Sequence, residues 1–145
     1  MARARLIGVN HVALEVGDVE RALEVYAALF EFELRGRGGS MAFIDMGDQF
    51  LALSEGRTQP PDEHRHFGLV VDDPEAVRAG AEAAGFELAG GRGLNLRDPW
   101  GNYVQVVSYS EIQFERTAGV KRKLGIEGLE KGASALAEID ERGLG

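Results

Sequence analysis

Cysteine is absent from the 145 residues of this chain, and long apolar runs are absent with it. Without cysteine there are no disulfide bonds, no thiolate metal ligands and no cysteine nucleophile. No apolar stretch approaches a membrane-spanning length, and the first residues lack the apolar core of a secretory signal. We therefore expect a cytoplasmic protein that does not enter a membrane.

Positive charge is also in short supply. The chain has 16 Lys and Arg residues against 24 Asp and Glu, which gives a formal net charge of −8. A surface that binds nucleic acid or anionic lipid needs clustered Lys and Arg. The one compact basic run, Lys121-Arg122-Lys123, has acidic residues on both sides, and we interpret it as a solvated face. The composition predicts no nucleic-acid partner and no membrane partner.

What the chain does contain is a repeated segment. The nine residues NHVALEVGD at 10–18 return in altered form as RHFGLVVDD at 65–73. In each copy a histidine opens an apolar, strand-like run, and an aspartate follows seven residues later, where a helical pattern begins. Because His11 and His66 occupy matching places in two copies of one unit, we expect their side chains to meet in a shared site.

The elements after each histidine repeat in the same order. In the first copy, alternation and helical spacing predict a strand at 10–16, a helix at 19–30 and strands at 32–35, 41–46 and 50–54. The second copy predicts a strand at 66–71, a helix that begins at Asp73-Pro74, and strands at 86–89, 93–97 and 103–108. One such β-α-β-β-β unit is too small to bury both faces of its sheet, so the two should pack as a pair.

These boundaries predict one domain over residues 1–109. It consists of module one at 6–56, a charged, proline-containing linker at 57–63 and module two at 64–109. Residues 110–145 break the pattern. Their Leu, Ile, Ala, Glu and Lys residues at helical spacing predict a helical C-terminal extension over 124–142, interrupted by glycines, that lies against the domain or a partner subunit.

Paired modules that open with HVALEV and close with DPWGNYVQV resemble the vicinal oxygen chelate superfamily over about residues 6–109. That superfamily contains glyoxalases, extradiol dioxygenases, fosfomycin-resistance transferases, epimerases and bleomycin-binding proteins. The resemblance implies an α+β fold in which two tandem βαβββ modules curl their mixed sheets into a cleft. It also implies a homodimer, because members often dimerise and sometimes build each cleft from modules of two chains.

The resemblance further implies a set of metal ligands. The first-strand positions are His11 and His66, and the fourth-strand position of module two, usually Glu, is Gln105. The equivalent position of module one is Ala52, which cannot bind a metal. Two imidazoles and one amide oxygen suit one divalent ion such as Zn, Fe, Mn, Ni or Co. The alternative is a pair of hydrogen-bonded strand histidines without an ion, with Gln105 as a cleft amide that binds a ligand; His64 is either a substitute ligand or a linker residue.

Strand alternation adds further residues to the expected cleft. Tyr103 shares the face of Gln105 and Glu15 shares the face of His11, so these two are candidate catalytic residues that hold or move a proton. The candidate substrate-binding residues are Asn95, Arg97, Phe43 and Trp100. For an Arg the alternative is an outer salt bridge, and for aromatic residues it is the core.

Two functions follow from the resemblance. The first is a metal-dependent enzyme of the lyase, isomerase or dioxygenase type that acts on a small oxygenated metabolite. The second is a metal-free protein that binds a small molecule or an antibiotic, as bleomycin-resistance proteins do. The retention of both His11 and His66 favours the enzyme, whereas Ala52 and Gln105 favour the binding protein. An assembly role through the C-terminal extension is a third possibility.

Overall fold

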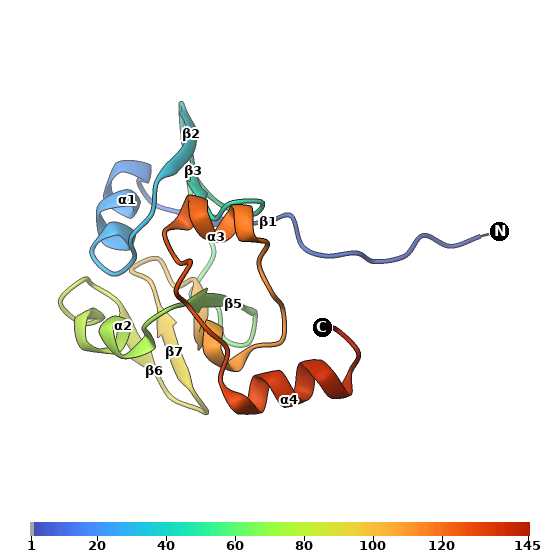
Figure 1. Cartoon of the computed structure of the whole chain (residues 1–145). Helices are drawn as coiled ribbons and strands as arrows, with labels where there is room; N and C mark the ends of the chain where they lie inside the picture. The colour runs from blue at the N-terminus through green and yellow to red at the C-terminus, as the bar shows by residue number, and fades with distance from the viewer. Residues whose placement is uncertain (1) are drawn as a thin grey trace.

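A computed structural model describes residues 2–145 and shows two β-α-β-β-β modules followed by a helical extension (Figure 1). The elements of module one are β1 (His11–Val16), α1 (Val19–Ala27), β2 (Leu34–Gly38), β3 (Met41–Asp45) and β4 (Phe50–Glu55). Those of module two are β5 (His66–Val71), α2 (Pro74–Gly80), β6 (Glu87–Ala89), β7 (Leu94–Arg97) and β8 (Tyr103–Ser108). The tandem βαβββ modules and the α+β class are confirmed.

Each module folds its four strands into one mixed sheet. The strand orders are β1-β4-β3-β2 and β5-β8-β7-β6, so β1 and β5 are edge strands. β1 runs parallel to β4 and β5 runs parallel to β8, while the other pairs are antiparallel. A parallel pair needs a crossover, and the helix of each module supplies it. Asp18 and Asp73 cap these helices by accepting hydrogen bonds from the backbone N–H groups of Arg21 and Ala76, as predicted.

Two boundaries differ from the predictions in module one. The helix ends at Ala27 rather than at residue 30, and the next strand occupies Leu34–Gly38 rather than 32–35. Residues 36–38, which fall between the two predicted strands, continue the edge strand, and the turn contains Gly39 at a φ of +56°. A register shift between Leu34 and Gly36 lets this strand pair with β3.

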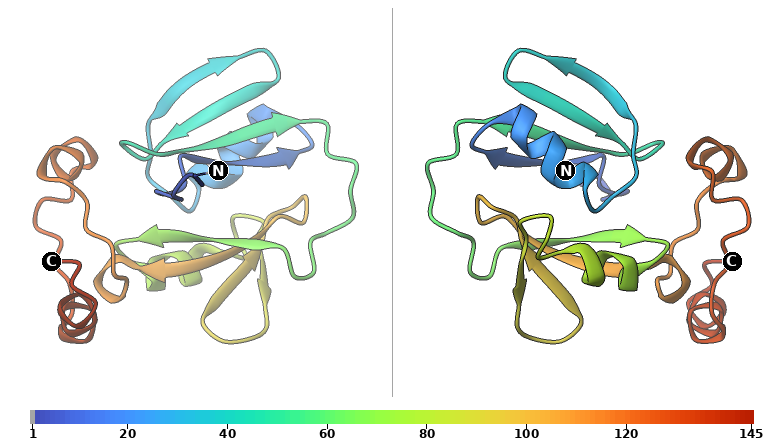
Figure 2. Two further views of the ribbon diagram at one scale, coloured as in Figure 1. Left: turned by 90° about the vertical axis from the view of Figure 1, so that its right-hand side faces the viewer. Right: turned by 90° about the vertical axis from the view of Figure 1, so that its left-hand side faces the viewer.

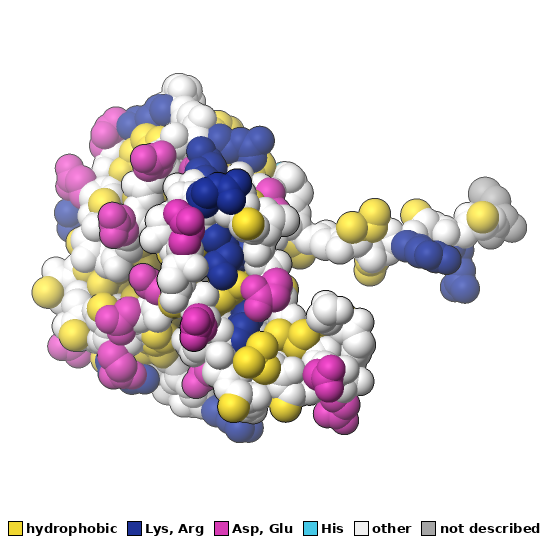
Figure 3. Space-filling model, in the orientation of Figure 1, with side chains coloured by type: hydrophobic (Ala, Val, Ile, Leu, Met, Phe, Trp, Pro, Cys, Tyr) yellow, Lys and Arg dark blue, Asp and Glu magenta, His cyan; other side chains and the backbone are white. Residues whose placement is uncertain are grey.

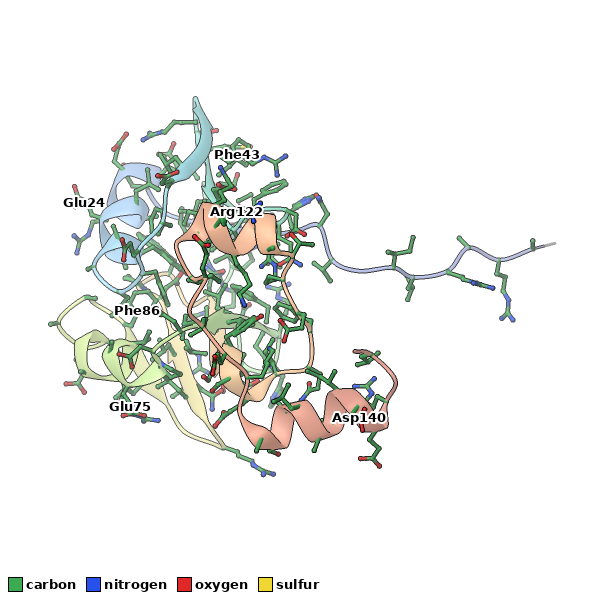
Figure 4. The ribbon with its side chains drawn as sticks, viewed as in Figure 1. Glu24, Phe43, Glu75, Phe86, Arg122 and Asp140 are labelled. Atoms are coloured by element: carbon green, nitrogen blue, oxygen red, sulfur yellow. The ribbon has the colours of Figure 1, made fainter. Side chains whose placement is uncertain are left out.

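One hydrophobic core runs through both modules. Tyr26 of α1 meets Phe86 edge to face at 5.4 Å, and its hydroxyl donates a 2.9 Å hydrogen bond to the buried Asp98 carboxylate. Figure 4 shows Phe86 where the two modules meet. Burial, reinforced by the Asp98 charge, raises the pKa of Tyr26 well above its ordinary value. The modules are therefore joined by packing and by a buried charge-assisted hydrogen bond.

The linker between the modules is fixed to the turn between β7 and β8. Arg57 is almost completely buried there; its guanidinium donates to Asn102 Oδ1 at 2.5 Å and pairs with the Asp62 carboxylate at 3.3 Å. The Nε of Arg97 donates to the Asp62 carbonyl at 2.9 Å. Figure 2 shows this segment crossing from the first sheet to the second. A charged linker of this kind fixes the relative placement of the modules rather than merely connecting them.

The C-terminal extension is helical, but its helices differ from the one predicted. It contains a 3-10 turn (η1, Tyr109–Glu111) and two helices, α3 (Ala118–Leu124) and α4 (Ala133–Glu141), where one interrupted helix over 124–142 was predicted. The run Lys121-Arg122-Lys123 lies in α3 and is not wholly a solvated face, because Lys123 pairs with the buried Asp45 carboxylate at 3.3 Å. No helix in the described part of the chain is both long and apolar enough to cross a membrane.

Candidate metal and ligand-binding faces

Each sheet presents one face that its helix does not cover. In β1, Leu14 and Val16 are buried in the core, whereas His11 and Glu15 point outward and are exposed. α1 and α2 lie on the same side of the molecule, behind the two sheets in the left panel of Figure 2. His11 and Glu15 therefore lie on the side of the first sheet that the helices leave open.

In module one the open face carries a histidine, an aromatic ring and an arginine in contact. The β1–β4 register places His11 beside Phe50, and their rings stack at 4.6 Å with an interplanar angle of 9°. The Arg35 guanidinium lies over the Phe50 ring, 4.7 Å from its centre. Phe43 meets Phe50 edge to face at 5.8 Å. Phe43, a predicted substrate-binding residue, therefore lies in contact with the Phe50 ring on which His11 stacks.

Module two carries the same three kinds of residue in contact. The β5–β8 register places His66 beside Tyr103, with ring centres 5.4 Å apart. The Arg97 guanidinium lies 4.8 Å from the centre of the Tyr103 ring. Each module therefore contains a His–aromatic–Arg cluster, which we call cluster one (His11, Phe50, Arg35) and cluster two (His66, Tyr103, Arg97).

Both histidines use the same ring nitrogen within the protein. His11 Nδ1 lies 2.7 Å from Asn10 Oδ1, and His66 Nδ1 lies 2.8 Å from the backbone carbonyl oxygen of His64. Because these oxygens accept hydrogen bonds, each Nδ1 carries the proton, and each Nε2 presents a lone pair to the open face. A hydrogen bond from Nδ1–H to a carbonyl oxygen is the usual arrangement of a metal-binding histidine.

The third predicted ligand belongs with His66. Gln105 pairs with Gly68 of β5, two residues along β8 from Tyr103, so it shares the open face of cluster two. In module one the equivalent Ala52 is 2% exposed and offers no donor. Within residues 2–145 no group of three or more His, Asp or Glu side chains is arranged to hold a metal ion.

A single chain does not bring His11 and His66 together. Asn102, which precedes β8, donates to the Glu15 carbonyl at 2.9 Å, so the end of β1 lies next to the start of β8 and hence near His66. His11 stands four residues earlier on β1, which is about 13 Å further along an extended strand. Figure 2 shows β1 and β5 running in opposite directions. The two predicted imidazoles therefore lie at opposite ends of these edge strands.

The structure places the remaining predicted residues differently. Asn95 pairs with Gln105 across β7 and β8 and shares its face, but it is buried there, and its amide donates to the carbonyls of Arg92 at 3.0 Å and Gly90 at 3.4 Å, so it holds the turn before β7. Trp100 lies against Gly17, where an added Cβ would come within 2.5 Å of the indole Nε1. Trp100 thus packs where the modules meet rather than on an open face.

Sequence reasoning missed Arg35. The predicted strand ended at this residue, and the register shift in β2 disturbs the alternation that would have assigned its face. The repeat gives no signal for it either, because Arg97 lies on the third strand of module two and Arg35 on the second strand of module one.

Comparisons with known proteins agree with this fold. The family model described as Glyoxalase/Bleomycin resistance protein/Dioxygenase superfamily matches residues 8–106. A glyoxalase/bleomycin resistance protein from Albidiferax ferrireducens is 20% identical with a TM-score of 0.59, covering 68% of this chain and 96% of the other. Fosfomycin resistance protein FosX from Mesorhizobium loti is 17% identical with a TM-score of 0.59, covering 70% and 91%.

A third solved structure is a variant of FosX from Listeria monocytogenes in complex with Mn(II) and 1S,2S-dihydroxypropylphosphonic acid. It is 17% identical to this chain with a TM-score of 0.60, and the match covers 70% of this chain and 92% of that one. At such identities the likeness establishes a shared fold.

Proposed function

The chain belongs to the glyoxalase/bleomycin resistance protein/dioxygenase superfamily, and we propose that it is a metal-dependent enzyme of the lyase, isomerase or dioxygenase type. It would bind one divalent ion (Zn, Fe, Mn, Ni or Co) and act on a small oxygenated metabolite. The observation that carries this proposal is the matched state of His11 and His66: each Nδ1 lies against an oxygen acceptor, and neither Nε2 has a hydrogen-bond partner within residues 2–145.

The residues present fit a divalent ion. His11 and His66 would hold it through Nε2, and Gln105 would add its amide oxygen from the face that it shares with His66. Since an amide is neutral, this set leaves the charge of the ion less compensated than a set with a carboxylate would. We therefore expect weaker binding than a glutamate at the position of Gln105 would give.

We propose that the cleft is completed by a second copy of the chain. One chain separates His11 from His66, because Asn102 fixes the end of β1, not its start, beside β8. The open face of module one is solvent-exposed around His11, and so is that of module two around His66. In a symmetric dimer, cluster one of each chain would face cluster two of its partner, which creates two identical clefts.

The side chains around this cleft suggest a small anion as the substrate. Arg35 and Arg97 lie on aromatic rings that hold their guanidinium groups in place, so both can donate to a carboxylate or a phosphonate. The Listeria FosX variant was crystallised with a dihydroxylated phosphonate, a ligand of this kind. Glu15 is an exposed carboxylate suited to accept a proton, and the Tyr103 hydroxyl is suited to donate one. When bound, a divalent ion supplies Lewis acidity toward a substrate oxygen.

A metal-free small-molecule or antibiotic-binding protein is the alternative, and one observation favours it. Ala52 is buried and Gln105 is neutral, so the described residues provide no third charged ligand. Such a protein would use the aromatic residues and arginines of the two clusters to hold an anionic ligand without altering it.

Metal analysis of the purified protein separates these functions. We expect about one equivalent of a divalent transition metal per chain after titration, and its loss in His66→Ala. The matched control is His64→Ala, because His66 Nδ1 contacts the backbone oxygen of His64 and not its ring. If wild type takes up less than about a tenth of an equivalent, the alternative stands. Metal retained in His66→Ala would show that the ligand assignment is wrong.

A further inference from the structure

The segment before β1 leaves the body of the protein as an extended arm. Residues 2–10 are exposed throughout, and Leu6, Ile7 and Val9 are exposed by 104%, 99% and 67%. Figures 1 and 3 show the arm projecting into solvent with apolar and basic side chains along it. The basic residues are Arg3 and Arg5. Neighbouring apolar side chains that are this exposed indicate a surface that is covered by something else.

A groove of about 820 Å³ lies between the modules, on the side of the molecule that carries the C-terminal extension. β5 forms one of its walls through residues 67–73, and Phe30 and Phe32 line it from module one. Phe67, Leu69 and Val71 are only half-buried there. β5 pairs with β8 alone, so its other edge has unpaired backbone groups.

The charge of the groove is opposite to that of the arm. Glu31, Glu33 and Asp72 line the groove, are exposed and form no ion pair within residues 2–145. Arg116 and Lys123 also line it, but each pairs with an aspartate of module one, Asp48 and Asp45. The carboxylates that remain free suit a segment with two arginines.

We propose that the arm of one chain adds as a strand to the free edge of β5 in a second copy of the chain. The inference rests on the shared cleft proposed above. A site between His11 of one chain and His66 of the other lies between equivalent positions of equivalent modules, so an approximate twofold axis passes through it. Strands related in this way run antiparallel, and the residues that precede His11 then continue along β5 of the partner.

The residues on the two strands match in this register. With His11 opposite His66, Leu6 lies opposite Val71 on the groove side, and Ile7 lies opposite Val70 on the other face of the sheet. Gly8, where an added Cβ would meet nothing within 4 Å, lies opposite the bulky Leu69, and Val9 lies opposite Gly68. Arg5 lies opposite Asp72, so the charges also agree. Both the unpaired edge of β5 and the carboxylates of the groove therefore favour the arm of a second copy of the chain as the occupant of the groove.

Disulfide cross-linking tests this pairing, because the natural chain has no cysteine to interfere. Ile7→Cys protein is mixed with Val70→Cys protein and oxidised, and the control mixture pairs Ile7→Cys with Leu136→Cys on the exposed side of α4. We expect a mixed disulfide in the first mixture and not in the second, since opposite residues of an antiparallel pair bring their Cβ atoms within disulfide reach. Equal cross-linking in both mixtures, or none in a protein that is dimeric, overturns the arm pairing and leaves the shared cleft standing.

Sedimentation of a second set of variants measures the strength of the contact. Leu6→Asp and Ile7→Asp together should weaken dimerisation by at least about tenfold, and Leu136→Asp should leave it unchanged. If the arm variant dimerises as strongly as wild type, the inference is overturned. It is also overturned if the dimer gives no cross-links and a small molecule that copurifies with it occupies the groove. A wild-type protein that stays monomeric at all concentrations overturns both this inference and the shared cleft.

Discussion

Module one surrounds its histidine with apolar side chains, whereas module two surrounds its histidine with polar ones. His11 stacks on Phe50 with Phe43 behind it, and the fourth-strand position is a buried alanine. His66 has the Tyr103 phenol beside it and the Gln105 amide further along the same strand. The Arg–aromatic contact is the same in both, at 4.7 and 4.8 Å. Both modules therefore contain a histidine and an Arg–aromatic contact, although Arg35 comes from the second strand of its module and Arg97 from the third, and only module two has a polar side chain at the fourth-strand position.

The turns at the ends of β3 and β7 also differ, because the aspartate in module two accepts more hydrogen bonds than the one in module one. Asp98 accepts hydrogen bonds from the backbone N–H groups of Trp100 and Asn102, from the Asn102 side chain and from the Tyr26 hydroxyl. Asp45, at the equivalent turn of module one, accepts from Gly47 and pairs with Lys123 of the extension. The Asp98 turn is thus held by its own residues and by Tyr26 of module one, while the Asp45 turn depends on the C-terminal extension. A site that needs both faces must combine two unequal halves.

The largest expected effect concerns these two aspartates. Asp98→Ala should lower the free energy of unfolding by about 3 kcal/mol, because it leaves several buried donors without an acceptor, and Asp45→Ala by about 1 kcal/mol. Urea denaturation followed by circular dichroism measures both. Equal losses in the two variants would remove the contrast between the turns.

Removal of the Tyr26 hydroxyl tests the asymmetry between the helices, since Ala81 holds the equivalent place in module two and offers no hydroxyl. Tyr26→Phe should cost about 2 kcal/mol. The pKa of Tyr26 is raised in the folded state, so the neutral phenol stabilises the fold at every pH below 10.0, the ordinary pKa of tyrosine. That contribution is lost as the pH rises from 10.0 toward the raised pKa of the folded state. Wild type should therefore lose stability above pH 10.0 more steeply than Tyr26→Phe. Parallel pH profiles of unfolding would contradict this.

Restoring a carboxylate should act only in module two. Gln105→Glu should raise metal affinity by about tenfold, because a charged oxygen replaces a neutral one beside His66. Ala52→Glu should give no gain and should lower stability, because it places a charge at a buried position. Isothermal titration with Zn or Mn, alongside thermal unfolding, measures both changes. Tighter binding in Ala52→Glu would show that module one can serve as a ligand face.

The smallest effect is expected at the arginines. Arg35→Gln and Arg97→Gln should each weaken binding of a small carboxylate or phosphonate by about threefold to tenfold, as loss of one exposed charge-assisted contact does. Arg97→Gln should also loosen the linker, because Arg97 holds the Asp62 carbonyl. Ligand titration and limited proteolysis of the linker separate these effects. A response at Arg97 alone would show that cluster one does not face the ligand.

Local patterns in the sequence predicted the modules well, because strand alternation and the Asp18 and Asp73 caps depend on neighbouring residues. Patterns could not place the residues that act across the chain. Asn95 and Trp100 were expected in the cleft, yet one holds a turn and the other packs between modules, since their partners come from distant segments. The separation of His11 from His66 is also a matter of module packing, which a duplicated sequence does not reveal.

The central claim is that each cleft combines cluster one of one chain with cluster two of its partner. Chains carrying His11→Ala and chains carrying His66→Ala are unfolded together, refolded and analysed for bound metal. Alone, each variant should bind none. A random mixture should recover about a quarter of the wild-type metal content, because half of the dimers are mixed and each of these has one intact cleft. A mixture that forms mixed dimers and still binds no metal would contradict the shared cleft.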